Sequence, residues 1–481
     1  MKSELKIKAL SPEEIAQAVG GRLVVFGNGA EKVTSITYDS RDVTEGSLFC
    51  AVKGERTDGH LYIGDVVKKG AACVLVNKEP TDIQGDFTAV VTDDTVKALG
   101  LLSGYYRSLS KAVVIGVTGS VGKTTTKDFI AAVTSESFVT LKTEGNHNNE
   151  IGLPMTLFSL TPECRVAVVE MGMSAKGEIS FMTKLARPKI GVITNVGTSH
   201  IGSLGSRENI RDAKLEIAEG IPEEGVLFIN GDDPLLAAEH YEFAFSVERY
   251  GVHSRSAAYK AMNIRTGADN TVFDIVYSNT AVINVEIPTL GRHNVYNALV
   301  AFAIGTMLGM DERRIRNGLK NFKSTGMRQK IYEMNGITVI EDCYNAAPES
   351  MRAAIEVLTS KAKKTGGTPC ALLGDMLELG EGTRLMHDQL GQLAAQMKIK
   401  KLYCYGAMAE TVAEAAIKKG IRAENVYVCS DISRPDIMAG MMNASLESGD
   451  VLLVKASRGV AAERVIGEMK KLQGSSTRRK S

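Results

Sequence analysis

The sequence predicts an α/β protein of about three domains, and three observations lead to this prediction. The chain has 481 residues, and a typical domain holds roughly 100–200 residues. Its 44% hydrophobic and 23% charged residues are close to the globular average. Short apolar runs alternate with helical stretches, a pattern typical of parallel sheets covered by helices. We therefore expect a small N-terminal α/β domain, a central parallel-sheet domain and a C-terminal α/β domain.

The central segment carries the clearest strand pattern. The character of the chain changes at Lys111, where the apolar run Ala112–Val117 leads into a glycine-rich turn and a helix from Thr124. Continuous apolar runs bounded by turns are typical of strands buried on both faces. A helix at Tyr296–Leu308 and the segment Asp311–Phe322 are expected to close this domain. Further buried strands are expected at Arg165–Val169, Ile190–Thr194 and Val226–Ile229.

The two flanking segments show the same alternation more weakly. In the N-terminal segment, Ser47–Val52 and Ala71–Val76 are interpreted as strands. A third series begins near Ile331, with expected strands at Ile337–Ile340, Ala371–Leu373, Lys401–Tyr405, Asn425–Cys429 and Val451–Val454. The predicted domains are 1–108, 109–328 and 329–481. The polar and basic residues from Gly474 to Ser481 are expected to form a frayed tail.

Composition narrows the classes of function. The net charge of +1 provides no strong field to attract nucleic acid or an anionic membrane. The seven cysteines form no C-x-x-C pair, which argues against a zinc or redox site and favours reduced thiols. The first ten residues lack the apolar core of a signal peptide, and no run approaches the roughly 18 apolar residues of a membrane span. We expect a cytoplasmic protein with small-molecule partners, no nucleic acid and no membrane. The oligomeric state stays open, with a monomer as the expectation.

A glycine-rich loop is the strongest local signal. It reads G-V-T-G-S-V-G-K-T from Gly116 to Thr124, between a buried strand and a helix. Backbone N–H groups in such a loop bind phosphate oxygens, Lys123 reaches the β- and γ-phosphates, and the Thr124 hydroxyl coordinates Mg²⁺. Val117 replaces the first glycine of the general motif, so only the shorter G-x-x-G-K-T form fits. The alternative is a glycine turn with a surface lysine, and the loop alone predicts no more than nucleotide binding. The predicted loop residues are Gly119, Ser120, Val121, Gly122, Lys123, Thr124 and Thr125.

Several further motifs follow the loop in a characteristic order. Together with T-G-S-V-G-K-T-T-T-K, they resemble the Mur ligase family, whose members build the stem peptide of peptidoglycan. The resemblance covers nearly the whole chain and implies a C-terminal domain that is Rossmann-like. The matching segments are D-S-R at Asp39–Arg41, E-G-N-H-N-N-E-I-G-L-P at Glu144–Pro154, E-M-G-M at Glu170–Met173, G-E-I at Gly177–Ile179, T-N-V-G-T-S-H at Thr194–His200, A-K-L-E-I at Ala213–Ile217, G-R-H-N-V-Y-N-A at Gly291–Ala298, G-M-R at Gly326–Arg328, D-C-Y-N-A-A-P at Asp342–Pro348, G-D-M-L-E-L-G at Gly374–Gly380 and K-A-S-R at Lys455–Arg458.

Two of these segments favour one branch of the family. E-M-G with G-E-I, and G-D-M-L-E-L-G, are similar to the branch that adds D-alanyl-D-alanine, and the D-N-P-R segment of the branch adding the third residue is absent. Three positions depart from the family pattern, namely Ala347, Glu341 and the pair Ser174-Ala175. The alternatives are a sister ligase of Mur or folylpolyglutamate type that adds one amino acid, and a P-loop kinase or nucleotide switch.

The resemblance implies an ATP-dependent amide ligase with UDP-muramoyl-tripeptide and D-Ala-D-Ala as substrates. ATP phosphorylates a carboxylate, and the amine then attacks the acyl phosphate. Lys123 and two Mg²⁺ ions offset the repulsion of the two anions. Thr124 and Glu170 are expected to hold the first Mg²⁺, and His200 and Lys214 lie near the second. Lys123, Glu170, His200 and Lys214 are thus the expected catalytic residues.

Lys214 and His200 each have a simpler interpretation. In the resembling enzymes the lysine is carbamylated by CO₂, whereas a solvated helix lysine beside Glu216 and Glu219 would look the same in sequence. His200 follows a strand and a glycine, which favours a functional role over a core or loop histidine.

For the remaining candidates, the resemblance to the family implies contacts with nucleotide or substrate. Asn294 and Asn297 share a helix face near adenine, with helix capping by Asn294 as the alternative. Arg328 and Asp342 are expected at phosphate and ribose, with an inter-domain ion pair as the alternative. The expected substrate-binding residues are Ser40 and Arg41 at the UDP-sugar (otherwise a surface turn), Asn146, Asn149, Tyr344 and Asn345, and Ser457 and Arg458 at the incoming dipeptide (otherwise a basic surface loop).

Overall fold

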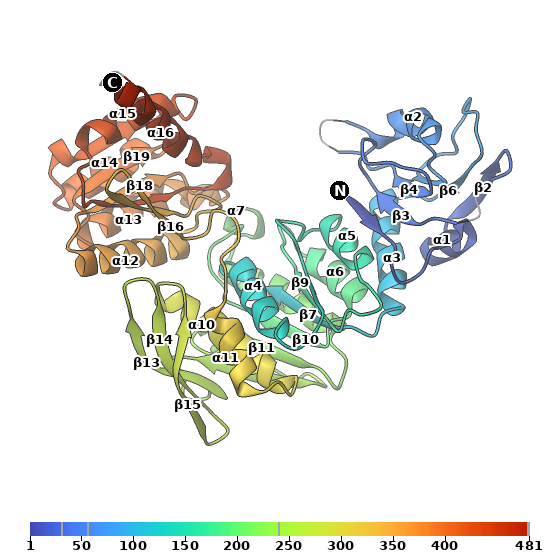
Figure 1. Cartoon of the computed structure of the whole chain (residues 1–481), viewed down its shortest axis with the longest axis horizontal. Coiled ribbons are helices and arrows are strands. Elements are labelled where there is room, and N and C mark those ends of the chain that lie inside the picture. The colour runs from blue at the N-terminus through green and yellow to red at the C-terminus, as the bar shows by residue number, and fades with distance from the viewer. Residues whose placement is uncertain (30–31, 55–56, 239–240, 479–481) are drawn as a thin grey trace.

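Three β-sheets follow one another along the chain (Figure 1). The computed structural model describes residues 1–29, 32–54, 57–238 and 241–478, and the side chains of these residues up to 472. The central sheet lies between the other two, so the N-terminal and C-terminal units approach it from opposite ends. The predicted α/β class with three sheet-containing domains is confirmed.

The N-terminal sheet is mixed. Its strand order is β1-β3-β4-β5-β6-β2, with the inner strands β3 to β6 parallel and both edge strands antiparallel. The two expected strands are present as the shorter β4 and β5. The elements are β1 Lys2–Glu4, α1 Pro12–Val19, β2 Arg22–Phe26, β3 Ser35–Thr37, β4 Ser47–Cys50, α2 Ile63–Lys68, β5 Cys73–Val76, β6 Phe87–Val91 and α3 Thr95–Ser108.

The central sheet is parallel around the glycine-rich loop. Its order is β15-β14-β13-β12-β11-β10-β7-β9-β8, parallel from β8 to β13. The β13–β14–β15 part is an antiparallel extension that the sequence interpretation did not include. The strands are β7 Val113–Thr118, β8 Thr140–Lys142, β9 Val166–Glu170, β10 Ile190–Ile193, β11 Val226–Asn230, β12 Ser246–Gly251, β13 Tyr259–Thr266, β14 Thr271–Tyr277 and β15 Thr280–Ile287.

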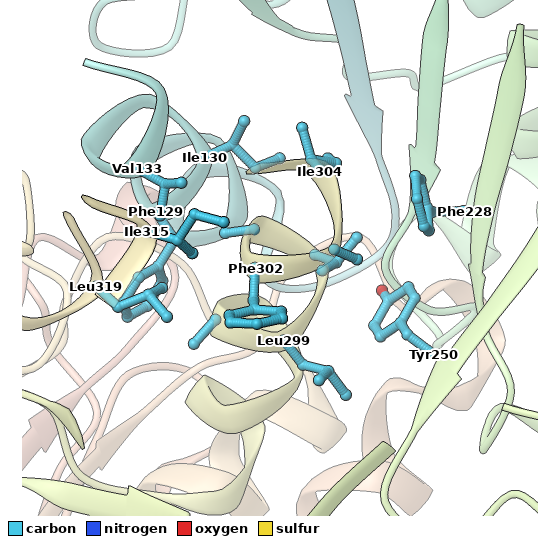
Figure 2. Packing of buried hydrophobic residues seen from close by; sticks show 14 of the residues in the cluster. Phe129, Ile130, Val133, Phe228, Tyr250, Leu299, Phe302, Ile304, Ile315 and Leu319 are labelled. Carbon is cyan, nitrogen blue, oxygen red and sulfur yellow. The ribbon is translucent and has the colours of Figure 1, made fainter. Parts of the chain in front are cut away.

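Helices cover both faces of the central sheet. On one face, α10 carries Leu299, Phe302 and Ile304 between the side chains of α4 and α11 on one side and Phe228 and Tyr250 of the sheet on the other (Figure 2). The same core includes Val117 of β7 and Phe129 of α4, the two elements that the loop joins. The helices are α4 Lys123–Thr134, α5 Gly152–Phe158, α6 Glu178–Ala186, α7 Ile201–Leu204, α8 Arg207–Leu215, α9 Pro234–Ala237, α10 Arg292–Met307 and α11 Glu312–Lys320.

The C-terminal sheet has the order β16-β17-β21-β18-β19-β20 and is parallel except for β16. All five expected strands are present within two residues of their predicted bounds. Helix α16 extends to Arg478, so the expected fraying from Gly474 is wrong up to that residue, and 479–481 lie outside the described residues. The elements are β16 Lys330–Met334, β17 Ile337–Glu341, α12 Pro348–Thr365, β18 Pro369–Gly374, α13 Thr383–Gln396, β19 Lys401–Tyr405, α14 Ala409–Lys418, β20 Val426–Cys429, α15 Pro435–Ser445, β21 Val451–Lys455 and α16 Glu463–Arg478.

No helix in the part of the chain that the structure describes is both long enough and apolar enough to cross a membrane.

Truncating Phe302 tests the core behind the loop. Its ring is fully buried and meets Tyr277 edge-on at 5.5 Å. We expect Phe302→Ala to lower the free energy of unfolding of the central domain by about 3–5 kcal/mol, because transfer and cavity costs add. Urea unfolding followed by circular dichroism measures it. Leu385→Ala, at a side chain that is 61% exposed, is the control and changes stability by about 0.5 kcal/mol or less; equal effects of the two would contradict this account of the core.

Candidate active site

The glycine-rich loop has the backbone that phosphate binding requires. It joins the end of β7 to the start of α4 at Lys123. Gly119 and Gly122 adopt φ values of 147° and 87°, which side-chain-bearing residues rarely do. A Cβ at Gly119 would lie 1.9 Å from Oγ1 of Thr194, so only glycine fits there. The loop N–H groups and the first turn of α4 thus form an anion site.

Side chains from the segment after β10 hold this loop in place. The N–H of Val121 donates to Oδ1 of Asn195 at 3.0 Å, and Nδ2 of Asn195 donates to the carbonyl of Val121 at 2.9 Å. The hydroxyl of Thr194 donates to the same carbonyl at 2.6 Å, and the N–H of Gly197 donates to Oγ of Ser120 at 2.9 Å. Asn195 was missed as a site residue, although it stands in the T-N-V-G-T-S-H motif.

Lys123 lies over the loop. Its Nζ donates to the carbonyl of Gly119 at 2.8 Å, inside the cavity described below. The alternative of a surface lysine on a glycine turn is therefore wrong. Burial lowers the pKa of Lys123; Glu170 raises it and Arg328 lowers it further.

Glu170 ends β9 with a carboxylate that is only partly satisfied. Its residue is 2% exposed. Oε1 accepts from Nδ2 of Asn148 at 2.8 Å, while buried Oε2 has no hydrogen-bond partner among the described residues. A buried carboxylate oxygen without a partner is costly and is well suited to a hard cation. Thr124, buried at the start of α4, lines the same cavity.

Lys214 is buried rather than solvated. It lies at the end of α8 and is 1% exposed, so the interpretation as a solvated helix lysine is wrong. Glu216 instead accepts from the N–H groups of Gly177 and Ser180. Within the described residues, Nζ of Lys214 makes no hydrogen bond or ion pair. Burial holds the pKa of Lys214 well below its usual range, and the charge of nearby Lys123 lowers it further.

His200 faces the cavity from the start of α7. Its Nδ1 lies 2.7 Å from Oε2 of Glu378, which comes from the C-terminal domain. Burial lowers the pKa of His200, Glu378 raises it, and Lys123 and Lys214 lower it. It is therefore not a core histidine; it lies in the turn that precedes α7, with its ring at the cavity.

The start of α10 forms the other end of the cavity. Nδ2 of Asn294 donates to the carbonyl of Leu290 at 2.9 Å and to Oε1 of Gln329 at 3.0 Å. Its Oδ1 accepts from Asn297, whose own Oδ1 accepts from Thr126. Gly291 is the N-cap of α10, so the capping alternative for Asn294 is wrong.

Residues of the C-terminal domain close the cavity. Nζ of buried Lys455 lies 2.6 Å from Oδ2 of Asp342 and donates to the carbonyl of Asn345 at 3.0 Å. The guanidinium of Arg328 lies over the ring of Tyr344, 4.0 Å from its centroid. Because Asp342 pairs with Lys455, the alternative that Arg328 and Asp342 form an inter-domain ion pair is wrong. Lys455 was not predicted, although its K-A-S-R segment was noted.

One cavity of about 1060 Å³ between the central and C-terminal domains gathers most of the predicted residues. Such a volume accommodates a nucleotide and part of a second substrate. The predicted residues that line it are Ser120, Val121, Gly122, Lys123, Thr124, Thr125, Asn146, Asn149, Glu170, His200, Asn294, Asn297, Arg328, Asp342, Tyr344 and Asn345.

Six predicted residues do not line this cavity. The carbonyl of Gly119 accepts from Lys123, which lines the cavity, and Lys214 is close enough to Lys123 for their charges to interact. Ser40 and Arg41 lie in the N-terminal domain, where Arg41 pairs with Asp39. Buried Ser457 accepts from the N–H of Leu377, and exposed Arg458 pairs with Glu463.

This architecture belongs to a known class of enzymes. Models of the Mur ligase family match the chain in three blocks: the Mur ligase middle domain at 117–305, the Mur ligase glutamate ligase domain at 327–458, and the Mur ligase family catalytic domain at 32–100. The chain belongs to the Mur ligase family.

Within the family, the similarity centres on one group. The UDP-N-acetylmuramoyl-tripeptide–D-alanyl-D-alanine ligase of Bacillus subtilis (strain 168) is 37% identical over 95% of this chain and 97% of its own length. Its namesake from Escherichia coli (strain K12) is 33% identical over 90% of this chain and 92% of its own. The crystal structure of MurF from Acinetobacter baumannii superposes with a TM-score of 0.86 at 29% identity, covering 96% of this chain and 99% of that one. The MurF ligase of Thermotoga maritima in complex with ADP has a TM-score of 0.80 at 27% identity, covering 91% and 97%.

Asn195 provides a test of the loop geometry. We expect Asn195→Ala to weaken binding of Mg²⁺–ADP about tenfold, because the loop loses two hydrogen bonds of about 1 kcal/mol each and part of its preorganisation. Isothermal titration calorimetry measures the affinity. Asn28→Ala, which removes an exposed amide in the N-terminal domain, is the control. An unchanged affinity in Asn195→Ala would show that the loop holds its shape without this clamp.

Proposed function

We propose that this protein is the ATP-dependent ligase that joins D-alanyl-D-alanine to UDP-N-acetylmuramoyl-tripeptide in peptidoglycan precursor synthesis. The observation that carries the proposal is the single cavity in which a phosphate loop, a half-satisfied buried carboxylate and several cations face the C-terminal domain. The near full-length similarity to ligases of that name supports the choice of substrates. A nucleotide switch, by contrast, would not need a second domain beside the phosphates of its bound nucleotide.

The first chemical step brings two anions together. An oxygen of the tripeptide carboxylate attacks the γ-phosphorus of ATP, and the bond from that phosphorus to the β–γ bridging oxygen breaks, which releases ADP. Lys123 and Arg328 both line the cavity, and their positive charges offset the repulsion. In the second step the amine of the dipeptide attacks the acyl carbon, loses a proton, and inorganic phosphate leaves.

Mg²⁺ fits the residues at the loop. The free Oε2 of Glu170 and the buried hydroxyl of Thr124 are oxygen ligands of the kind this ion prefers. No group of three or more His, Cys, Asp or Glu side chains in the described ranges could hold a metal alone, which suits an ion that also takes phosphate oxygens as ligands. When bound, Mg²⁺ neutralises charge on the phosphates. His200 and Lys214 are proposed at a second Mg²⁺.

Lys214 suits carbamylation. Burial and the charge of Lys123 lower the pKa of its amine; this shift favours the neutral form, which is the form that attacks CO₂. The product is a carbamate, an anion, and a released proton. An anion at this position would replace the repulsion from Lys123 with attraction and would supply oxygen atoms toward the second Mg²⁺.

The three domains divide the substrates. We assign the UDP-sugar-peptide to 1–108 with Ser40 and Arg41, ATP to 109–328, and the dipeptide to 329–481. Asn146, Asn149, Tyr344 and Asn345 all line the cavity, and we assign the first two to the tripeptide and the last two to the dipeptide. Ser457 and Arg458 complete the dipeptide site, with Arg458 exchanging Glu463 for the substrate carboxylate. The protein acts as a cytoplasmic monomer, where ATP is supplied and the seven buried thiols stay reduced.

An omission experiment tests the proposed function. Phosphate release is measured with ATP, Mg²⁺, UDP-muramoyl-tripeptide and D-Ala-D-Ala, each left out in turn, and the product mass is recorded. We expect release only with all four and a mass gain of one dipeptide. Turnover with a single amino acid or glutamate instead would move the protein to a sister ligase, and release from ATP alone would favour a nucleotide switch.

Lys214→Ala tests the carbamate. We expect a loss of ligation of about 100-fold or more, because a group that sets the metal and phosphate charges is missing. Added short carboxylates such as formate or acetate should restore part of the activity by occupying the vacated space. Lys184→Ala, an exposed lysine paired with Glu219, is the control. Full activity of Lys214→Ala would remove the carbamate from the mechanism.

A further inference from the structure

The central and C-terminal domains meet closely beside His200. The N–H of Gly202 in α7 donates to the carbonyl of Glu378 at 3.2 Å. A Cβ on Gly380 would lie 2.7 Å from Cα of Gly202, so the two backbones touch with no room for a side chain. Figure 1 shows α7 beside the C-terminal domain. We call His200, Gly202, Glu378 and Gly380 the docking joint.

The docking joint contains two residues in an uncommon backbone conformation. His200 has φ of 64° and Glu378 has φ of 65°, and neither is glycine. Such left-handed residues persist where the surrounding structure determines them, and they concentrate at functional sites. Here the two left-handed residues belong to different domains and bring Nδ1 and Oε2 to 2.7 Å.

This contact gives the two ring nitrogens of His200 different surroundings. Nδ1 meets the carboxylate of Glu378, while Nε2 has no protein partner among the described residues, and the ring lines the cavity that also holds Lys123. A carboxylate on one ring nitrogen selects the tautomer and orients the other nitrogen, as in metal sites where a carboxylate supports a histidine ligand.

We propose that Glu378 is a positioning residue that orients His200 toward the phosphate end of the cavity only when the C-terminal domain is docked. Docking of the domain that carries the dipeptide thereby completes the phosphoryl-transfer site. The inference rests on the proposed function for its kinetic consequence, but the orientation of His200 is a property of the free protein.

The ion pair between His200 and Glu378 contributes little to holding the two domains together. Its effect on the orientation of the imidazole can therefore be tested separately from domain docking. The Glu378 side chain is 61% exposed, and exposed ion pairs contribute little to stability. Other contacts also join the C-terminal domain to the central domain. Nζ of Lys361 in α12 donates to the carbonyl of Ala268 at 3.1 Å and to Oδ1 of Asp269 at 2.6 Å, at the turn between β13 and β14. Removing the Glu378 carboxylate should therefore leave the domains together and release only the imidazole.

The first experiment removes the carboxylate. Nitrogen NMR of histidine-labelled protein, with the His200 signal assigned from His200→Gln, reports which ring nitrogen carries the proton. We expect the wild type to show one tautomer, Nδ1–H, and Glu378→Ala to show a mixture. In the omission assay, kcat of Glu378→Ala should fall about tenfold, with the KM for ATP and for the dipeptide within about twofold of wild type, as expected for an interaction made only in the transition state. Glu378→Gln keeps an acceptor oxygen and should recover the tautomer and most of kcat.

Glu381→Ala is the matched control, because this exposed glutamate lies three residues away. It should change neither readout. A single unchanged tautomer in Glu378→Ala would overturn the proposal whatever happens to kcat, because the carboxylate would then not set the ring. A failure of wild-type protein to ligate would instead count against the proposed function and leave the NMR result standing.

The second experiment disturbs the docking joint by a substitution in the central domain. Gly202→Ala places a methyl group 2.8 Å from the backbone nitrogen of Gly380, while Ser203→Ala makes a similar change at an exposed neighbour in the same helix. Hydrogen exchange of the segment 198–206 reports docking. We expect Gly202→Ala to speed exchange there and to reproduce the tautomer mixture, and Ser203→Ala to match wild type. Rapid exchange with an unchanged tautomer would show that docking and orientation of His200 are independent, which contradicts the proposal.

Discussion

Unpaired and mutually repelling charges around the phosphate loop are the constraint on which the rest of this structure depends. Lys123 and Arg328 line the cavity, and burial and the charge of Lys123 both disfavour a charge on Lys214. Glu170 is the buried carboxylate at the loop, and one of its oxygens has no partner in the described chain. Such an arrangement is unfavourable by itself and becomes favourable when polyphosphate, a carboxylate and a hard cation enter. The charged groups at the loop therefore lack partners that the substrates and the metal ion would supply.

The fold provides the rigidity that this charge arrangement needs. The anion loop is held by Asn195 and Thr194 from the next strand, and α10 supports α4 from behind. The cavity is then completed by a second domain rather than by a loop. Lys455 pairs with Asp342 there, so the charge of this buried lysine is neutralised within the C-terminal wall. In the proposed reaction, closure of the two domains would also exclude water from an acyl phosphate that water would hydrolyse.

Local features of this architecture were predictable from sequence, and features that depend on distant partners were not. The run Ala112–Val117 followed by glycines predicts a strand, a phosphate loop and a helix, because all three depend on neighbouring residues. The clamp by Asn195 was missed because it joins positions 74 residues apart. Lys455 was missed for the same reason, since its partner Asp342 is 113 residues away.

The antiparallel extension shows the limits of periodicity. Strands β13 and β15 alternate exposed and buried residues with irregular steps, and the register shifts within both pairs of strands. Their pattern is therefore weaker than that of the fully buried β7 and β9. Burial also decided between interpretations that the sequence left open. In the sequence, Lys214 looks like a solvated helix lysine, and only its burial, with 1% of the residue exposed, excludes that interpretation.

The most direct test of the account follows oxygen atoms from the carboxylate. UDP-muramoyl-tripeptide is labelled with the heavy oxygen isotope in its terminal carboxylate and ligated to D-Ala-D-Ala with unlabelled ATP. If the cavity joins the carboxylate to the γ-phosphorus, each ligation transfers one labelled oxygen into inorganic phosphate, and mass spectrometry of the phosphate detects it. Phosphate free of the label, together with a normal ligation product, would contradict the acyl phosphate and with it the role given to the charged cavity.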